Sequence, residues 1–243
     1  MKAYNRLIPH LLHQGFTVCG FDLPGHGESP GPWGVLDGAE VVRHHLAARA
    51  KLRGQALPVF LYGHSLGGFT VAASVSRDSS GLAGVILGSA ALGNPLPWPF
   101  PSLMRAVARL FPRLPLVHLP ADRLTHIEAV REEAAHDPLM YKGSMCLLLA
   151  SSILKISAAD RCLYPGWTAP VLVLHGTEDF CTDPVFGVRA YEAMRSEKTL
   201  YLVPGAYHEL LNDTRRDDVL AAMLEWLDRR VIRFISRLVC LRR

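Results

Sequence analysis

The chain has 243 residues, of which 49% are hydrophobic, 20% are charged and 8% are aromatic. This composition supports a buried core and excludes a disordered or fibrous protein, and the length fits one α/β domain that carries an insert. The 26 Lys and Arg against 22 Asp and Glu give a formal net charge of +4. Six of the arginines lie in the last fifteen residues, so the remainder is near neutral and no nucleic-acid surface is expected.

Five short apolar runs rich in β-branched residues recur along the chain and predict strands. They span residues 16–22, 58–64, 84–90, 170–176 and 199–205. Between them, apolar residues at helical spacing predict helices at residues 35–53, 67–77 and 217–230. Near-continuous apolar strands that alternate with helices are typical of a parallel sheet covered on both faces. The sequence therefore predicts an α/β fold.

The pattern changes in the middle of the chain and again at its end. A proline-rich run at residues 94–101 opens a helical insert, residues 93–166, between two core segments, residues 1–92 and 167–230. The last segment is a basic tail, residues 231–243, with apolar residues at helical spacing: Val231, Phe234, Ile235 and Leu238. Such a tail either lies on an anionic membrane as an amphipathic helix or continues the last helix and packs on the core.

Cysteine usage and hydropathy indicate where the protein acts. The five cysteines include no CxxC pair and no Cys/His pair at zinc spacing, which predicts a reduced compartment and no structural metal. Pro9 and neighbouring histidines interrupt the N-terminal apolar stretch, so it lacks the core of a signal peptide. The longest uncharged stretch, residues 79–104, carries prolines that make it too broken to span a bilayer. We expect a soluble, cytoplasmic protein, with peripheral membrane contact through the insert or the tail as the open alternative.

A candidate nucleophile lies directly after the second apolar run. Residues 63–67 read Gly-His-Ser-Leu-Gly, a GxSxG motif that follows a predicted strand and opens a predicted helix. In this context the glycines permit a sharp, strained turn that lifts the hydroxyl of Ser65 above the sheet. A glycine-rich packing turn without chemistry is the alternative.

A serine nucleophile needs a base and an acid that orients the base. Asp179 follows the predicted strand at 170–176, and His208 follows the predicted strand at 199–205. Because the carboxyl ends of parallel strands lie at one edge of the sheet, both residues are expected near Ser65. Asp183 is the competing candidate for the acid. Among the other histidines, five are interpreted as structural: His26, His44, His45, His64 and His175.

Several strings of the sequence together resemble a known family. Residues 20–31 (GFDLPGHGESPG), 57–68 (LPVFLYGHSLGG), 174–184 (LHGTEDFCTDP) and 198–213 (KTLYLVPGAYHELLND) are similar to the monoacylglycerol lipase and lysophospholipase group of α/β-hydrolases, which is related to the serine aminopeptidase type. Residues 136–145 (HDPLMYKGSM) resemble the family's cap, so the insert is included in the similarity.

The resemblance implies a Ser–His–Asp esterase that cleaves lipid monoesters through an acyl-enzyme under a helical cap. The family's triad falls on Ser65, Asp179 and His208, and the backbone N–H of Leu66 is one oxyanion donor. No metal or organic cofactor is needed, and the expected partner is a small-molecule lipid ester. An apolar run in the insert is expected to line an acyl pocket, touch a bilayer or pack on the core: Pro95, Trp98, Phe100, Leu103, Val107 and Leu110.

The start of the chain departs from the family pattern. Relatives place a further strand before the helix that corresponds to residues 2–14, and the loop after it supplies the second oxyanion donor. This strand, which normally lies between those matching residues 16–22 and 58–64, is expected to be missing. Two explanations stay open: a truncated form of an active enzyme, or a catalytically impaired relative that acts as a binding protein. A peptidase or thioesterase with the same triad is the nearest alternative activity.

Overall fold

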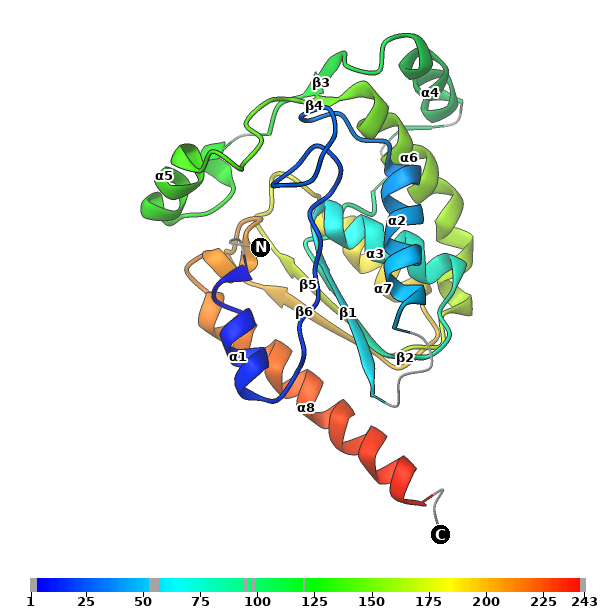
Figure 1. The fold of residues 1–243 in the computed structure, drawn as a ribbon, viewed down its shortest axis with the longest axis vertical. Coiled ribbons are helices and arrows are strands. Elements are labelled where there is room, and N and C mark those ends of the chain that lie inside the picture. The colour runs from blue at the N-terminus through cyan, green and yellow to red at the C-terminus, as the bar shows by residue number, and fades with distance from the viewer. Residues whose placement is uncertain (1–3, 53–56, 94–95, 98, 120, 241–243) are drawn as a thin grey trace.

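A computed structural model gives the fold and describes residues 4–52, 57–93, 96–97, 99–119 and 121–240 (Figure 1). Its main sheet has four strands in the order β1-β2-β5-β6, and every neighbouring pair is parallel. The strands are β1 (Val59–His64), β2 (Leu82–Gly88), β5 (Val171–Gly176) and β6 (Lys198–Val203). The predicted parallel α/β architecture is confirmed, and four of the five predicted strands form.

Helices cover both faces of this sheet because its strands are apolar on both sides. Val85 and Leu87 of β2 point into one core with α3 and α7, whereas Ile86 points into a second core with α1 and α8. The helices of the two faces are α1 (Ile8–His13), α2 (Gly38–Ala50), α3 (Leu66–Arg77), α7 (Pro184–Ala193) and α8 (Arg216–Cys240). Figure 1 shows α1 and α8 on one side of the sheet and α3 and α7 on the other.

The segment between β2 and β5 contains helices and also a small two-stranded antiparallel sheet, β3 with β4, which the sequence pattern did not predict. Its α6 is anchored on α2 and α3 through a third core in which Leu149 and Ile153 meet Val41 and Phe69. The elements are α4 (Phe100–Leu110), β3 (Pro115–Val117), a 3-10 turn (Ala121–Arg123), α5 (Glu128–His136), β4 (Met145–Cys146), α6 (Leu147–Asp160) and a second 3-10 turn (Arg161–Gly166). A further 3-10 turn, Leu210–Asn212, precedes α8.

The predicted strand at residues 16–22 is wrong: this segment is extended coil that runs past β1 (Figure 1). Within the described residues β1 pairs on one side only, with β2. Among the described residues, no backbone ladder joins residues 16–22 to β1, so this segment is not a strand. Its contact with the sheet is through side chains, since the rings of Phe16 and Phe60 meet edge to face with centroids 5.9 Å apart. The apolar residues in this segment therefore reflect side-chain packing on the sheet and not backbone pairing in a strand.

The last helix continues without a break from Arg216 to Cys240, across the boundary expected at residue 231. Its final turns extend beyond the sheet (Figure 1). The proposed amphipathic stripe falls mostly on residues 233–243, whose side chains lie outside those described. Among the described residues, no helix combines the length and the apolar character needed to cross a bilayer.

Trp226 of α8 is buried in the second core and is expected to stabilise the fold. Its ring is 5% exposed and meets Phe60 edge to face. It also lies so close to Gly84 that a Cβ there would come within 2.6 Å of the indole. Trp226→Ala is expected to lower the free energy of unfolding by about 3–5 kcal/mol, because the cavity left behind cannot collapse fully. Urea denaturation measures this, with Leu110→Ala, a side chain that is 77% exposed, as the control expected to change little; equal effects would contradict the packing described.

Candidate active site

Ser65 lies in a strained turn between β1 and α3. Its φ of 54° and ψ of −118° place a non-glycine residue in a region that L-residues rarely adopt. Both of its peptide groups are anchored: the N–H donates to the carbonyl of Gly88 at 3.0 Å, and its carbonyl accepts from Ala91 at 3.2 Å. The end of β2 therefore holds the turn in place.

Close backbone approach explains two of the glycines around this turn. A Cβ at Gly63 would lie 2.3 Å from the carbonyl oxygen of Gly67, and a Cβ at Gly68 would lie 2.4 Å from Ala90 Cβ. A Cβ at Gly67 meets nothing within 4 Å. The steric need for glycine after the serine therefore falls on Gly68, and not on the second glycine of the GxSxG motif.

The three residues singled out by the sequence converge at the ends of three strands. Ser65 Oγ lies 2.8 Å from Nε2 of His208, and Nδ1 of His208 lies 2.8 Å from Oδ2 of Asp179. His208 is 3% exposed and Asp179 is 7% exposed. With the proton on Nδ1, His208 donates to the carboxylate and accepts from the serine hydroxyl. This arrangement can activate a hydroxyl as a nucleophile.

The carboxylate of Asp179 is buried but fully surrounded by donors. The backbone N–H groups of Cys181 and Thr182 donate to Oδ1 at 2.8 and 3.0 Å, and the hydroxyl of Thr182 donates to Oδ2 at 2.8 Å. Burial alone would raise the pKa of Asp179, but the hydrogen bonds from His175 and His208 outweigh it and hold the pKa well below its usual range. Asp179 is therefore an anion whenever the protein is folded near neutral pH.

The competing aspartate has another role. Asp183 is the N-cap of α7, and its side chain accepts from the N–H of Val185 at 2.9 Å. Two histidines interpreted as structural lie close to the site. His64 Nε2 lies 2.9 Å from the carbonyl of His208, and His175 Nε2 lies 3.3 Å from Oδ2 of Asp179. The His64 contact joins the end of β1 to the loop after β6, which sequence spacing does not reveal, whereas His175 and Asp179 lie four residues apart at the end of β5.

The backbone N–H of Leu66 opens α3 directly beside Ser65. N–H groups in the first turn of a helix have no acceptor within the helix, and the helix dipole places positive potential there. An oxyanion formed next to Ser65 would find a donor in this position. The role of Leu66 as an oxyanion donor stays a prediction.

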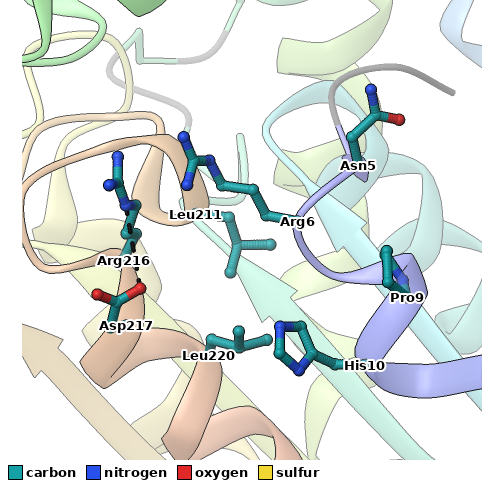
Figure 2. A pocket seen from close by; sticks show the side chains of 8 residues that line it. All are labelled: Asn5, Arg6, Pro9, His10, Leu211, Arg216, Asp217 and Leu220. Carbon is teal, nitrogen blue, oxygen red and sulfur yellow. Dashed lines mark ion pairs between the residues drawn. The ribbon is translucent and has the colours of Figure 1, made fainter. Parts of the chain in front are cut away.

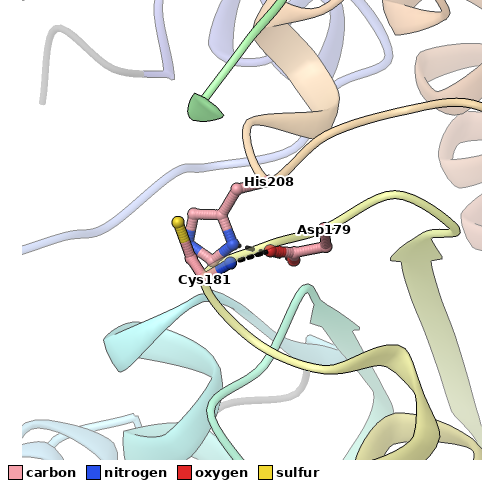
Figure 3. A group of neighbouring side chains, drawn as sticks. All are labelled: Asp179, Cys181 and His208. Carbon is pink, nitrogen blue, oxygen red and sulfur yellow. Dashed lines mark hydrogen bonds and ion pairs between the residues drawn. The ribbon is translucent and has the colours of Figure 1, made fainter. Parts of the chain in front are cut away.

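Asp179, Cys181 and His208 form a cluster whose ligand atoms lie within 4.8 Å of one another, a spacing that a metal ion could use (Figure 3). The chemistry does not fit a metal. Burial and the nearby Asp179 charge raise the pKa of the Cys181 thiol to about 12, whereas metal ligation needs the thiolate. His208 and Asp179 are joined by their own hydrogen bond, so the cluster is explained without an ion.

A hollow of about 180 Å³ lies between α1 and the start of α8 (Figure 2). Its lining consists of Asn5, Arg6, Pro9, His10, Leu211, Arg216, Asp217 and Leu220. None of these residues belongs to the Ser65–His208–Asp179 arrangement. The hollow is therefore separate from the candidate reaction site.

The parallel sheet, the strained turn at Ser65 after β1, and Asp179 and His208 after two later strands are features of an α/β-hydrolase, and the similarity to solved structures shows this fold. A family model described as serine aminopeptidase, S33, matches residues 1–215. The chain belongs to this family. Family and relatives together place it among the carboxylic ester hydrolases, as the resemblance of the motifs predicted.

Two relatives and two solved structures illustrate the similarity. Monoacylglycerol lipase of Mycolicibacterium smegmatis is 29% identical over 92% of this chain and 82% of its own length. Human monoglyceride lipase is 30% identical over 85% of this chain and 71% of its own. The crystal structure of Paleococcus ferrophilus monoacylglycerol lipase superposes with a TM-score of 0.84 at 31% identity, covering 94% of this chain and 90% of that one. A soluble variant of the Saccharomyces cerevisiae monoglyceride lipase shares the fold, with a TM-score of 0.79 at 22% identity over 95% and 82% of the two chains.

The lowered pKa of Asp179 makes part of the stability depend on pH. Because the folded state holds this carboxyl ionised below its unfolded pKa of about 3.9, the unfolded state takes up the proton first as the pH falls. The stabilisation is thus fully present above the unfolded pKa and is lost as the pH falls toward the folded pKa. The difference in free energy of unfolding between wild type and Asp179→Asn is expected to be constant above about pH 5 and to shrink below about pH 4.

Urea denaturation of both proteins across this range measures the difference. Asp183→Asn is the matched control, because asparagine caps a helix as well as aspartate does; its difference from wild type should stay small throughout. A difference for Asp179→Asn that does not change with pH would contradict the assigned ionisation.

Proposed function

We propose that the chain is a serine hydrolase that cleaves carboxylic esters of lipids, of the monoacylglycerol or lysophospholipid type, through a Ser–His–Asp triad and an acyl-enzyme. The observation that carries the proposal is the continuous hydrogen-bonded series Ser65–His208–Asp179, with both links at 2.8 Å. Residues 93–166 act as the cap over this site, and no cofactor takes part.

The proposed mechanism starts from a neutral His208, which carries its proton on Nδ1, and an ionised Asp179. Nε2 of His208 takes the proton of Ser65 as the serine oxygen attacks the ester carbonyl, and the N–H of Leu66 donates to the oxyanion. The protonated imidazole then gives its proton to the leaving alcohol, which leaves an acyl group on Ser65. A water molecule, deprotonated by His208, hydrolyses this acyl-enzyme. The charge on Asp179 stabilises the imidazolium in both steps.

Two lines of support favour a lipid ester over other acyl substrates. Several of the relatives are named as monoacylglycerol or monoglyceride lipases, and one from Bacillus subtilis is named as a phospholipase. The cap also presents a large apolar surface, which suits a water-insoluble substrate. A peptidase or thioesterase would use the same triad and is the alternative activity to be tested. A catalytically impaired binding protein is the alternative without activity.

Labelling by a fluorophosphonate probe tests the nucleophile. Wild-type protein is expected to label, and Ser65→Ala is expected to remain unlabelled and to lose on the order of a millionfold in kcat, as other Ser–His–Asp enzymes do. Ser89→Ala is the matched control, since Ser89 is a fully buried serine with positive φ at the end of the neighbouring strand. It should leave labelling in place.

A substrate panel then separates the candidate activities. Long-chain monoacylglycerol and lysophospholipid should be hydrolysed faster than an acyl-CoA thioester or an aminoacyl amide. Faster cleavage of the thioester or the amide would replace the lipid assignment by the thioesterase or peptidase. A folded wild-type protein that neither labels nor hydrolyses any ester would favour the binding protein.

We also propose that the protein meets its substrate at a membrane surface through the cap. The apolar side chains of α4 at spacings of three and four residues point away from the core, while Ala108 on the other side of the helix is buried. The cap surface consists of Phe100, Leu103, Val107, Leu110, Phe111, Leu114 and Leu116, each at least 38% exposed. Pro95 and Trp98 lie outside the described residues. Arg109 and Arg113 are exposed among these side chains, which favours anionic lipid. A cytoplasmic location for this contact stays a prediction, as does a role for the basic tail.

Vesicle binding tests the cap surface. The double variant Leu110→Ser/Phe111→Ser is expected to lower the partition coefficient by about tenfold or more, because burial of each large apolar side chain is worth about 1.5–3 kcal/mol. Sedimentation with phosphatidylcholine vesicles, with and without phosphatidylserine, measures this. Leu12→Ser on α1, a side chain that is 56% exposed, is the matched control and should bind like wild type. Equal partition of all three proteins would refute docking through the cap.

A further inference from the structure

Asp213, between a 3-10 turn and α8, is a buried carboxylate that the triad does not use. It is 0% exposed, and its side chain collects donors from two separate parts of the chain. Oδ2 accepts from the N–H of Tyr207 at 2.8 Å, and Oδ1 accepts from the N–H of His126 at 2.9 Å. Nδ1 of the His126 ring lies 3.0 Å from both oxygens, and the hydroxyl of Thr125 lies 3.2 Å from Oδ1. The carboxylate therefore joins the cap to the segment that carries His208.

The two sequence neighbours of His208 are both fixed by this junction. The N–H of Tyr207 is held by Asp213, and the N–H of Glu209 donates to the carbonyl of Leu124 in the cap at 2.9 Å. His64 contacts the carbonyl of His208 itself at 2.9 Å. Because the side-chain direction of a residue follows its backbone, these three bonds fix where the imidazole points.

Contacts between aromatic rings also join the cap to the loop that carries Asp179. The imidazole of His126 stacks on the ring of Tyr207 with centroids 3.6 Å apart. Tyr207 in turn meets Phe180, the residue after Asp179, edge to face at 5.5 Å. The guanidinium of Arg123 lies 4.7 Å above the Phe180 ring. The cap segment 123–126 thus contacts the loops of both the base and the acid.

The charge state of Asp213 suits this role. Burial alone would raise its pKa, but the hydrogen bonds from Tyr207 and His126 outweigh burial and hold the pKa below its usual value. An ionised carboxylate accepts on both oxygens at once, which a neutral acid or an amide cannot do.

We propose that Asp213 is a positioning residue for catalysis: it holds cap segment 123–126 against residues 207–209, so that His208 points at Ser65. This inference rests on the proposed serine hydrolase function. It assigns to Asp213 no contact with substrate; Asp213 acts through the backbone of Tyr207 and through the cap.

The variant Asp213→Asn keeps the side-chain volume but replaces one acceptor oxygen by an NH₂ group. The N–H of either Tyr207 or His126 then faces a donor and loses its partner. We expect kcat for a short, soluble ester to fall by about 10- to 100-fold, because small displacements of a reacting group cost this much. KM should change by less than about threefold. Asp217→Asn, in the first turn of α8 with a side chain that is 94% exposed, is the matched control and should keep wild-type kcat and KM.

Titration with the fluorophosphonate probe separates positioning from folding. If Asp213 only stabilises the fold, fewer sites will be titrated, but kcat per titrated site will equal that of wild type; this result would overturn the inference. If Asp213→Asn does not fold, His126→Ala takes its place, because this side chain is about 35% exposed and removes only one donor and the stack on Tyr207. A fall in its kcat per titrated site of about three- to tenfold is expected, and an unchanged value would overturn the inference.

A readout that does not need turnover keeps this test distinct from that of the proposed function. The proton on Nδ1 of His208, shared with Asp179 at 2.8 Å, should give a low-field proton NMR signal in wild type and in Asp217→Asn. In Asp213→Asn this signal should shift or broaden. If it stays unchanged, the positioning role is refuted, whereas loss of ester hydrolysis in wild type with a normal signal would refute the proposed function alone.

Discussion

The buried carboxylate of Asp179 is the constraint on which the candidate site depends. A carboxylate out of water is strongly unfavourable unless donors surround it, and the loop after β5 supplies them from Cys181 and Thr182. These bonds fix the loop as much as they satisfy the charge. Oδ2 also accepts from Nδ1 of His208, whose ring is thereby held with Nε2 toward Ser65, while Nε2 of His175 lies 3.3 Å from the same oxygen. The buried charge of Asp179 thus determines how the His208 ring is oriented toward Ser65.

The end of β2 connects the turn at Ser65 to the loop that carries Asp179. The carbonyl of Gly88 accepts from the N–H of Ser65 at 3.0 Å, and the next residue, Ser89, donates its N–H to Leu174 of β5 at 2.8 Å. The carbonyl oxygen of Ser89 lies 3.0 Å from the hydroxyl oxygen of Thr182. Both Ser65 and Ser89 have positive φ, a strain that persists because both are tied to the parallel sheet. Hydrogen bonds to the sheet therefore fix the positions of these loops relative to each other.

The sequence predicts features that follow from local residue patterns. It does not predict features that depend on contacts with distant parts of the chain. Apolar runs identified four strands, and the order of residues at strand ends located Ser65, Asp179 and His208. The same kind of run at residues 16–22 predicted a strand that does not form, since apolar character reports burial and a strand also needs a neighbour. Asp213 and its contacts with the cap could not be predicted, because they join residues about 87 positions apart. The only local signal was an aspartate five positions after His208, just before a long helix.

The segment between β2 and β5 is attached to the core on two sides, and directional bonds contribute on both. On one side α6 packs into an apolar core with α2 and α3. The N–H of Gly38 in α2 donates to Ser152 Oγ of α6 at 2.8 Å, and Arg77 of α3 pairs with Asp160 of α6 at 2.9 Å. On the other side segment 123–126 is held by hydrogen bonds to Asp213 and Glu209, which tolerate little displacement before they break. Both attachments therefore oppose displacement of this segment relative to the sheet, because moving either one breaks hydrogen bonds that the core holds in place.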